Sequence, residues 1–348
     1  MSARHSVVCA GYMPLDIIHT QAGTAGRHAG GTAANVAAIL TFLGWEAVLA
    51  GQTGGDVAGD ELMADLRNTG VDTGQIHRSP TAETARLIHE VRHNGHSFAY
   101  RCPDCGSRFP RSRPLTLEQA DACALAHPEP TVYFFDRANA ATVALAERYV
   151  RAGSVVVFEP SVPANVDLLA RAATVAHVIK HSDDRSVGGL DDLHIQPRAG
   201  QLRIVTHGAE GLALRVGSTR PRRLPALATL AVDTGGAGDW TTAGFLSKAV
   251  GTDGLDPARF EQAARFGQAL AAVACATIGA RTAMRLTRGS VLRRARNVLA
   301  SGGLTSEPRL PKRAPLARPD GACATCLMPV APALFDIASG GVSSPNIG

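Results

Sequence analysis

Short apolar runs alternate with segments of helical pattern along most of the chain, and this rhythm limits the fold more than any other feature. An apolar run at residues 6–11 is followed by a helical pattern at 33–43, which ends at Gly44 as a C-cap would. A second run at 46–50 leads to a helical pattern at 61–68. This alternation predicts an α/β fold, a doubly wound and mainly parallel sheet flanked by helices.

The same rhythm returns in the second half of the chain. Strands are predicted at 132–135, 154–158, 176–179 and 202–206, a hairpin-like strand at 212–216, and helices at 140–151, 260–278 and 291–300. In the first half, the strand at 6–11 is expected to end near Asp16, and residues 21–35 are expected to form a glycine-rich loop before the first helix.

Length and composition fit an ordinary globular protein. The 348 residues, of which 45% are hydrophobic and 19% charged, can form one large α/β domain with an extension, or two modest domains. The first residues contain a strand-like run at 7–11 instead of a secretion signal. The longest apolar span, 270–280, is too short to cross a bilayer. We therefore expect a cytoplasmic protein with no membrane partner.

The alternation breaks at residues 84–101, where two extended runs flank Asn94-Gly95. Asn-Gly between extended runs is the strongest short-range signal for a β-hairpin. A hairpin inserted into a parallel domain suggests a lid, or a contact through which two copies could form a homodimer. We assign residues 1–300 to the main domain and 301–348, rich in Pro, Gly and Arg, to a C-terminal tail.

The net charge of +5 is concentrated late in the chain, between Arg281 and Arg318. Nucleic-acid-binding surfaces interleave basic residues with aromatic ones or carry a groove-reading motif, and this stretch contains no Phe, Tyr or Trp. A solvated, partly mobile basic segment is the interpretation that we favour, and we expect no nucleic-acid partner.

Residues 231–244 carry the strongest signal for chemistry. They read A-V-D-T-G-G-A-G-D-W-T-T-A-G, an apolar end followed by small residues and by Asp239 at a predicted helix start. Glycines let the backbone turn its N–H groups toward a ligand, and a helix start adds positive potential, so this segment suits an anion. A carboxylate at such a site repels a bound phosphate, so its presence there is explained if its task is to take a proton from an attacking hydroxyl. The alternative is a glycine-rich turn with an Asp near a helix start.

Two stretches together point to a family. Residues 30–37 read G-G-T-A-A-N-V-A and are followed by Leu43-Gly44, while residues 233–239 read D-T-G-G-A-G-D. They resemble the two signatures of the ribokinase family, also called the phosphofructokinase-B family, of ATP-dependent sugar and nucleoside kinases. The resemblance covers roughly residues 5–300 and implies a ribokinase-like fold with a small β-hairpin lid.

The resemblance implies roles for residues on the acceptor side. Asp239 matches the catalytic base, and the N–H groups of Gly236, Ala237 and Gly238 match an anion hole for the transferring phosphoryl group. Positions that hold the acceptor's other hydroxyls are matched by Asp16, Gly30, Gly31 and Asn35. A strand-end turn at Asp16 and a helix-start turn at 31–35 are the structural alternatives.

On the nucleotide side the resemblance is looser. Residues 206–211, T-H-G-A-E-G, resemble the family's nucleotide loop, and Gly279 resembles the end of the adenine-side segment. The positions that would meet ATP are Lys180, Ser182, Thr206, Gly208, Gly211 and Thr234.

Several residues depart from the family pattern. Ser182 and Arg185 stand where an Asn and a Glu linked to magnesium are usual, so the route to Mg²⁺ is open. Lys180 and Arg185 could act on phosphate directly, or Asp183 and Asp184 could hold the metal through water. Residues 158–161 also lack the usual Asp and Arg, and Trp240 stands where a small residue is common.

The cysteines form two Cys-x-x-Cys pairs, Cys102 with Cys105 directly after the hairpin and Cys323 with Cys326 in the tail. Two such pairs complete a tetrahedral four-sulfur site, so we predict a structural Zn²⁺ that pins the tail beside the lid. Redox pairs and unlinked surface thiols are the alternatives. The remaining cysteines lie in apolar contexts typical of inert core thiols, namely Cys9, Cys123 and Cys275.

The function that these features favour is ATP- and Mg²⁺-dependent phosphoryl transfer to a hydroxyl of a sugar or nucleoside. The alternative is a non-catalytic, ribokinase-like protein that senses a sugar or nucleotide and uses a zinc-pinned tail to bind a partner. The complete segment at 233–239 favours the kinase, because a sensor needs no base at an anion hole.

Overall fold

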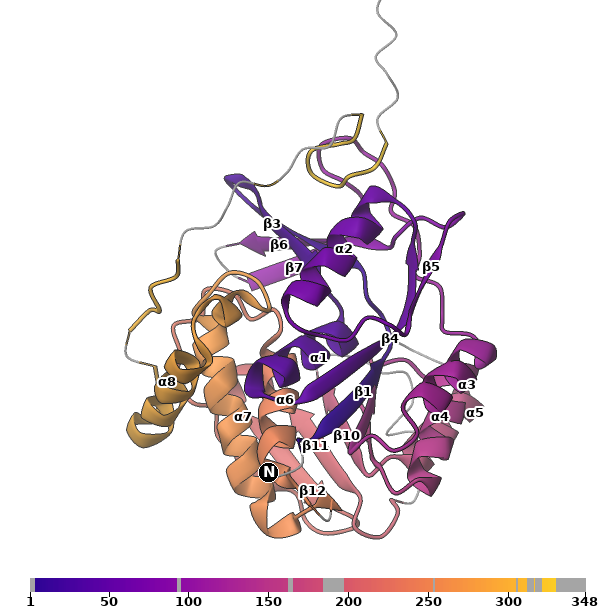
Figure 1. The fold of residues 1–348 in the computed structure, drawn as a ribbon. Coiled ribbons are helices and arrows are strands. Elements are labelled where there is room, and N and C mark those ends of the chain that lie inside the picture. The colour runs from indigo at the N-terminus through magenta and orange to yellow at the C-terminus, as the bar shows by residue number, and fades with distance from the viewer. Residues whose placement is uncertain are drawn as a thin grey trace, which may run out of the picture.

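The structure, a computed structural model, describes residues 4–92, 95–161, 165–183, 197–252, 254–304, 306–311, 316 and 321–329. A nine-stranded sheet runs through its centre (Figure 1). In spatial order the strands are β13 (Arg222–Leu224), β12 (Leu212–Val216), β11 (Leu202–Thr206), β10 (Val178–Ser182), β9 (Val155–Phe158), β8 (Val132–Phe135), β1 (Ser6–Ala10), β4 (Glu46–Gly54) and β5 (Ile76–Ser79). Pairing is parallel from β11 to β5 and antiparallel at β12 and β13. The predicted mainly parallel sheet is confirmed.

Helices cover both faces of this sheet, which is why its central strands are apolar throughout. One layer contains α1 (Thr32–Leu43), α2 (Val57–Asn68), α6 (Ala237–Ala249), α7 (Phe260–Cys275) and α8 (Arg288–Ser301). The other contains α3 (Leu117–Ala126), α4 (Ala140–Arg151) and α5 (Val166–Val175). Each layer encloses its own cluster of buried apolar side chains against the sheet. No helix among the described residues is long and apolar enough to span a membrane.

A second sheet of four strands forms the lid above the main sheet (Figure 1). Its order is β3 (Gly23–Ala29), β2 (Leu15–Thr20), β6 (Arg86–Arg92) and β7 (Gly95–Ala99). The antiparallel β6–β7 hairpin occurs where the sequence predicts it, with its turn residues 93–94 outside the described residues. The prediction of a loop over 21–35 was wrong, because residues 23–29 pair with β2 as an antiparallel strand.

Other boundaries differ from the prediction. Helix α2 begins at Val57 because the Asp56 side chain caps it by accepting a hydrogen bond from the Gly59 N–H. Helix α7 ends at Cys275, three residues before the expected end, and β10 runs on to Ser182. Helices α3 and α5 had no counterpart in the prediction. A short pair, β14 (Val250–Gly251) with β15 (Gly254–Leu255), follows α6.

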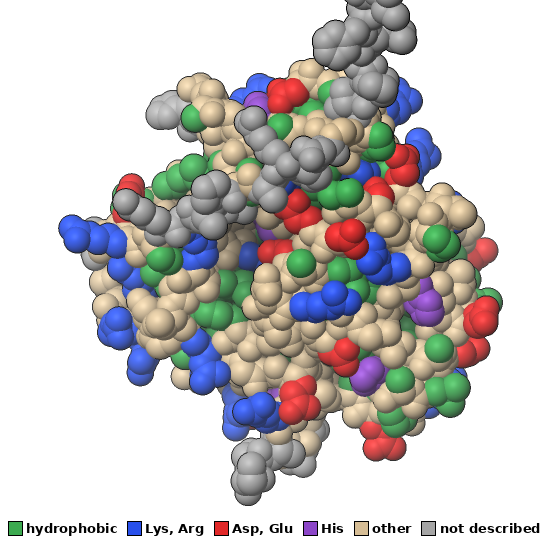
Figure 2. Space-filling model, turned by 45° about the horizontal axis from the view of Figure 1, so that its top comes forward, with side chains coloured by type: hydrophobic (Ala, Val, Ile, Leu, Met, Phe, Trp, Pro, Cys, Tyr) green, Lys and Arg blue, Asp and Glu red, His purple; other side chains and the backbone are tan. Residues whose placement is uncertain are grey.

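The basic stretch after residue 280 is not one solvated segment, so that expectation was wrong for its first part. Arg281 is buried, and its guanidinium group pairs with Asp65 and donates to the carbonyl oxygen of Ala29. Helix α8 is ordered against α7, and only its outer side exposes arginines. Figure 2 shows basic side chains gathered over this side of the molecule.

Candidate active site

The start of α6 is shaped by glycine. Gly236, the N-cap residue, has φ +81°, and a Cβ there would lie 2.5 Å from the Cβ of Ala280. The helix begins at Ala237, so Asp239 lies in its first turn, where backbone N–H groups lack partners within the helix. The Ala237 N–H donates to the carbonyl oxygen of Thr234 at 3.1 Å, so Gly236 and Gly238 are the stronger candidates for anion binding.

The two signature stretches meet at Asp239, the predicted base. The Asn35 side chain, in the first turn of α1, donates from Nδ2 to Oδ2 of Asp239 at 2.7 Å across 204 positions of sequence. Both side chains are buried. The starts of α1 and α6 therefore converge on one point, as a site that handles an anion next to a carboxylate requires.

Asp16 lies beside the first signature, on β2 and not in a turn after β1. A Cβ on Gly30 would lie 2.6 Å from Oδ2 of Asp16, so only glycine permits this approach. Burial raises the pKa of Asp16 to about 6, while His89 and Arg281 oppose the shift and Asp233 adds to it. Gly31, the N-cap of α1, has φ +86°, and a Cβ there would lie 2.0 Å from the carbonyl oxygen of Tyr12.

The lid meets the second signature through two histidines that the sequence analysis missed. His89 on β6 forms an ion pair with Asp233, with Nε2 and Oδ1 3.3 Å apart, and His96 on β7 lies 3.1 Å from the hydroxyl of Thr234. Burial lowers the pKa of His89, but the Asp233 carboxylate raises it to a net position above its usual value. Thr234 therefore contacts the lid. On the face shown in Figure 2 the surface is hollowed, and acidic and histidine side chains lie in the hollow.

A buried pair of charged side chains lies next to the glycine turn before α6. Lys180 on β10 donates to Oε1 of Glu159 at 2.6 Å, and Thr242 on α6 donates to Oε2 at 2.7 Å. A Cβ on Gly238 would lie 3.4 Å from Nζ of Lys180, so this ammonium group sits beside the first turn of α6. The sequence predicted Lys180 but treated Glu159 only as a departure from the family pattern.

Most of the residues predicted to meet the nucleotide lie at or just after the ends of β10 and β11. Ser182 and Thr206 are register partners on these strands. Gly208 and Gly211 have φ +52° and +108°, and a Cβ on Gly211 would lie 2.1 Å from the carbonyl oxygen of Leu224. The Asp183 carboxylate forms a hydrogen bond with His207, with Oδ2 of Asp183 2.6 Å from Nδ1 of His207. Residues 184 and 185 lie outside the described residues.

A further acid that the sequence analysis missed is Asp136, directly after β8. Its Oδ1 accepts from the Tyr12 N–H at 3.0 Å, and a Cβ on Gly11 would lie 1.8 Å from that oxygen. Burial raises its pKa to about 6, with Arg137 opposing the shift. A carboxylate at the end of a fully apolar strand is the signal that could have found it.

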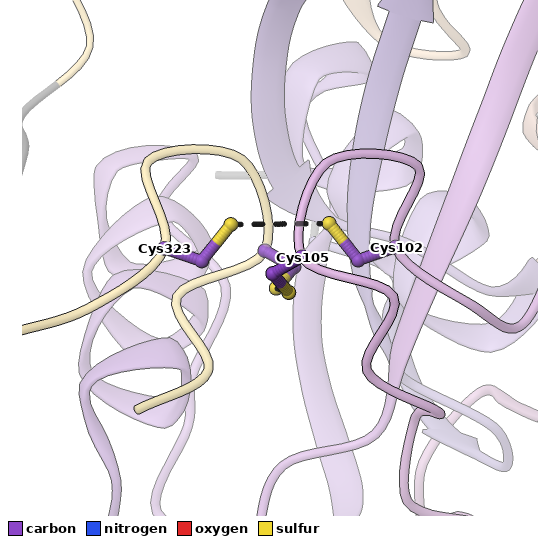
Figure 3. A group of neighbouring side chains, drawn as sticks. Cys102, Cys105 and Cys323 are labelled. Atoms are coloured by element: carbon purple, nitrogen blue, oxygen red, sulfur yellow. Dashed lines mark hydrogen bonds between the residues drawn. The ribbon is translucent and has the colours of Figure 1, made fainter. Parts of the chain in front are cut away.

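The four predicted cysteines come together in one cluster at the outer side of the lid. Their sulfur atoms all lie within 4.8 Å of one another, an arrangement that could hold a metal ion. The sulfurs of Cys102 and Cys323 point toward each other from two facing loops and are 3.8 Å apart (Figure 3). The other cysteines are buried, and burial raises the pKa of Cys123 and of Cys275 to about 11, which keeps both as thiols.

Comparison with known proteins identifies relatives. Residues 4–287 match the pfkB family carbohydrate kinase. The chain is 28% identical over 240 residues to a fructokinase of Klebsiella pneumoniae, covering 63% of this chain and 76% of that protein. It is 26% identical over 302 residues to the aminoimidazole riboside kinase of Salmonella typhimurium, covering 82% of this chain and 93% of that protein.

Solved structures show the same fold. An aminoimidazole riboside kinase from Salmonella enterica, complexed with aminoimidazole riboside and an ATP analog, has a TM-score of 0.64 at 23% identity, over 83% of this chain and 100% of that one. A fructokinase with bound ATP from Xylella fastidiosa has a TM-score of 0.67 at 22% identity, over 86% and 99% of the two chains. Since the sequence match extends over most of its length, this chain belongs to the pfkB family of carbohydrate kinases.

Proposed function

We propose that the protein transfers the γ-phosphoryl group of ATP to a primary hydroxyl of a sugar or nucleoside, with Asp239 as general base. The observation that carries the proposal is the buried contact of Asn35 with Asp239 at the point where two helix starts converge. A carboxylate there is positioned to take a proton from a hydroxyl, and amides are positioned to meet the phosphoryl oxygens.

The reaction is a direct displacement. The acceptor oxygen gives its proton to Asp239 as it bonds to the γ-phosphorus, and the bond from that phosphorus to the β–γ bridging oxygen breaks. ADP leaves with the electron pair of that bond. The N–H groups of Gly236 and Gly238, with the Ala237 amide as a weaker contributor, stabilise the charge on the transferring group.

The acceptor's other hydroxyls are assigned to Asp16, Asn35 and the backbone at Gly30 and Gly31. These residues offer carboxylate and amide groups around a backbone that approaches Asp16 closely. Relatives named as a fructokinase and as an aminoimidazole riboside kinase support two acceptor classes, a hexose and a riboside.

On the donor side we propose that Ser182, Thr206, Gly208 and Gly211 border the nucleotide, with Thr234 near the phosphates. Lys180 supplies positive charge beside Gly238. Mg²⁺ accompanies ATP in phosphoryl transfer and neutralises phosphate charge. Both oxygens of Glu159 already accept hydrogen bonds, so the half-exposed carboxylate of Asp183 suits an ion held through water better.

We include a structural Zn²⁺ at the four cysteines and place the protein in the cytoplasm, where ATP is available and thiols stay reduced. A homodimer through the lid stays a prediction. It would have to use lid surface other than the face that the cysteine loops cover.

The alternative function is a regulatory protein that binds a sugar or nucleotide without turning it over. The absence of the usual Asn and Glu pair near Ser182 favours it. The contact between Asn35 and Asp239 opposes it, because a binding protein has no need for a base beside an anion site.

The experiment that decides between them measures ADP formation by the full chain with ATP and Mg²⁺ against pentoses, hexoses and nucleosides, including fructose and aminoimidazole riboside. The kinase proposal expects acceptor-dependent ADP formation with at least one compound. Binding of an acceptor by calorimetry, with no ADP formed above the acceptor-free rate, would favour the regulatory alternative.

A further inference from the structure

The two cysteine loops have the same backbone geometry although they lie 221 positions apart. In the first loop, the Cys102 N–H donates to the carbonyl oxygen of Ser107, and the Gly106 N–H donates to that of Cys102. In the second loop, the Cys323 N–H donates to the carbonyl oxygen of Met328, and the Leu327 N–H donates to that of Cys323. The residue after the second cysteine is left-handed in both loops, Gly106 at φ +72° and Leu327 at φ +59°.

Leu327 is the one described residue other than glycine with positive φ. A bulky residue in this conformation is strained and persists only where its surroundings enforce it. The tail loop is therefore held in the shape of a metal-binding turn at a cost in backbone energy.

The spacing of the sulfurs matches a tetrahedral ion. A Zn–S bond of about 2.3 Å implies sulfurs about 3.8 Å apart at the corners of the tetrahedron. The Cys102–Cys323 pair is at 3.8 Å and the Cys105–Cys326 pair at 3.5 Å. Sulfurs at a disulfide bond would be about 2 Å apart. Four thiolates close the coordination shell, so the site is structural and leaves no position for a substrate.

Two buried arginines tie the tail loop to the lid and to the main domain at once. Arg86 on β6 donates from Nε to the carbonyl oxygen of Cys326 at 2.8 Å and pairs with Asp56, the N-cap of α2, at 2.8 Å. Arg27 on β3 donates to the carbonyl oxygen of Ala324 at 2.7 Å and pairs with Glu61 of α2 at 2.8 Å.

The cluster covers one face of the lid sheet, and the acceptor site uses the other. Ile17 and Ile88 are register partners on β2 and β6, and both pack against the cysteines. Successive side chains of a strand point to opposite faces. Their neighbours Asp16 and His89 therefore face the site, where His89 pairs with Asp233.

We propose that one Zn²⁺, bound by Cys102, Cys105, Cys323 and Cys326, clamps the C-terminal tail onto the outer face of the lid and thereby holds Asp16 and His89 in position for the acceptor. The effect on the acceptor rests on the proposed function. The clamp itself does not, because metal content and lid protection can be measured without turnover.

The test begins with the full chain purified without added metal. Elemental analysis is expected to find about one zinc per chain. Cys105→Ser, at the exposed cysteine of the cluster, is expected to lose that zinc and to show faster backbone hydrogen exchange in β2 and β6. If the closed lid is then populated only about a tenth of the time, the KM of the acceptor rises about tenfold. Cys123→Ala, on the buried side of α3 and away from the cluster, is the matched control and keeps wild-type zinc, exchange and KM.

Several results would overturn the clamp. They are the absence of stoichiometric metal, iron in place of zinc, or a zinc-free Cys105→Ser protein whose lid exchange is unchanged. If that variant does not fold, hydrogen exchange of the wild-type protein before and after removal of zinc by a chelator decides the same question. Zinc and a zinc-dependent lid without kinase activity would contradict the proposed function alone.

Discussion

At the scale of single residues, the carboxyl of Asp16 makes the proposed acceptor site sensitive to pH. It is buried on β2 against Gly30, and its pKa of about 6 reflects mainly the loss of water around the carboxylate. Above pH 6 the group is ionised and can accept hydrogen bonds from two hydroxyls. Below pH 6 it gains a proton and loses that capacity.

We therefore predict that kcat/KM for the acceptor falls as the pH drops below about 6. Asp16→Asn should abolish this acidic limb and lower kcat/KM about 10- to 100-fold, because hydrogen bonds to charged groups contribute about 1.5–3 kcal/mol each. Asp136→Asn is the control, since the pKa of Asp136 is also about 6. If the acidic limb disappears in Asp136→Asn and persists in Asp16→Asn, the titrating group is Asp136 and the prediction for Asp16 is wrong.

Lys180 is predicted to act on phosphate and not only to neutralise Glu159. Lys180→Met should lower the free energy of unfolding by about 3–5 kcal/mol, because it leaves the Glu159 carboxylate buried without its cation. The double variant Lys180→Met with Glu159→Gln should regain most of that stability, yet keep a kcat lower by about 100- to 1,000-fold. Chemical denaturation and ADP release measure the two effects, and a double variant with near wild-type kcat would make Lys180 purely structural.

At the scale of elements, the lid strands and the loop before α6 are joined by His89 and Asp233. The pKa of Asp233 lies below its usual value, since the effect of burial is outweighed by His89 and by the amides of Gly235 and Gly279. Asp233 thus stays ionised, while the raised pKa of His89 lets this side chain keep its proton to a higher pH than an ordinary histidine. Because the folded pKa of His89 is raised, its charge stabilises the fold below its unfolded pKa of about 6.5. That stability is lost as the pH rises through the folded value.

His89→Gln should therefore lower the free energy of unfolding by roughly 1–3 kcal/mol near pH 6, and by less near pH 9. Urea denaturation at the two pH values measures this difference. His77→Gln, at an exposed position on β5, should show no such trend. An equal loss at both pH values would show that the pair contributes through packing and not through charge.

The sequence predicted helices and strands whose signal lies within the segment itself, and it missed a strand that forms only by pairing with another strand. The β6–β7 hairpin has a turn signal of its own, whereas β3, reading G-T-A-G-R-H-A, becomes a strand only by pairing with β2. Helix α3 did carry a usable signal, the capping box of Thr116 and Gln119.

At the scale of the whole molecule, the parts of the site that are contiguous in sequence could be predicted, and the parts assembled by folding could not. The two signatures predicted Asn35 and Asp239 as site residues, and the structure brings their side chains into contact. Nothing local in the sequence indicates that His89 or Glu159 lies beside the second signature. The cysteines were an exception, because a tetrahedral site needs four ligands and the chain offers two spaced pairs.

The C-terminal tail also forms contacts that the sequence alone does not predict. Its composition gives no core pattern, yet residues 321–329 return to the lid beside the loop at 102–106 (Figure 1). There Arg27 and Arg86, which pair with acids at the start of α2, donate hydrogen bonds to carbonyl oxygens of the tail. Contacts to backbone carbonyl groups leave no trace in a sequence.

The most direct test of the account is the turnover of Asp239→Asn beside its affinity for the acceptor. If Asp239 removes the proton, kcat should fall about 100- to 10,000-fold, the usual contribution of a general base. The acceptor dissociation constant from calorimetry should stay within about threefold of wild type, because the lost interaction is made in the transition state. A variant that turns over within about tenfold of the wild-type rate would contradict the assignment of Asp239 as the base.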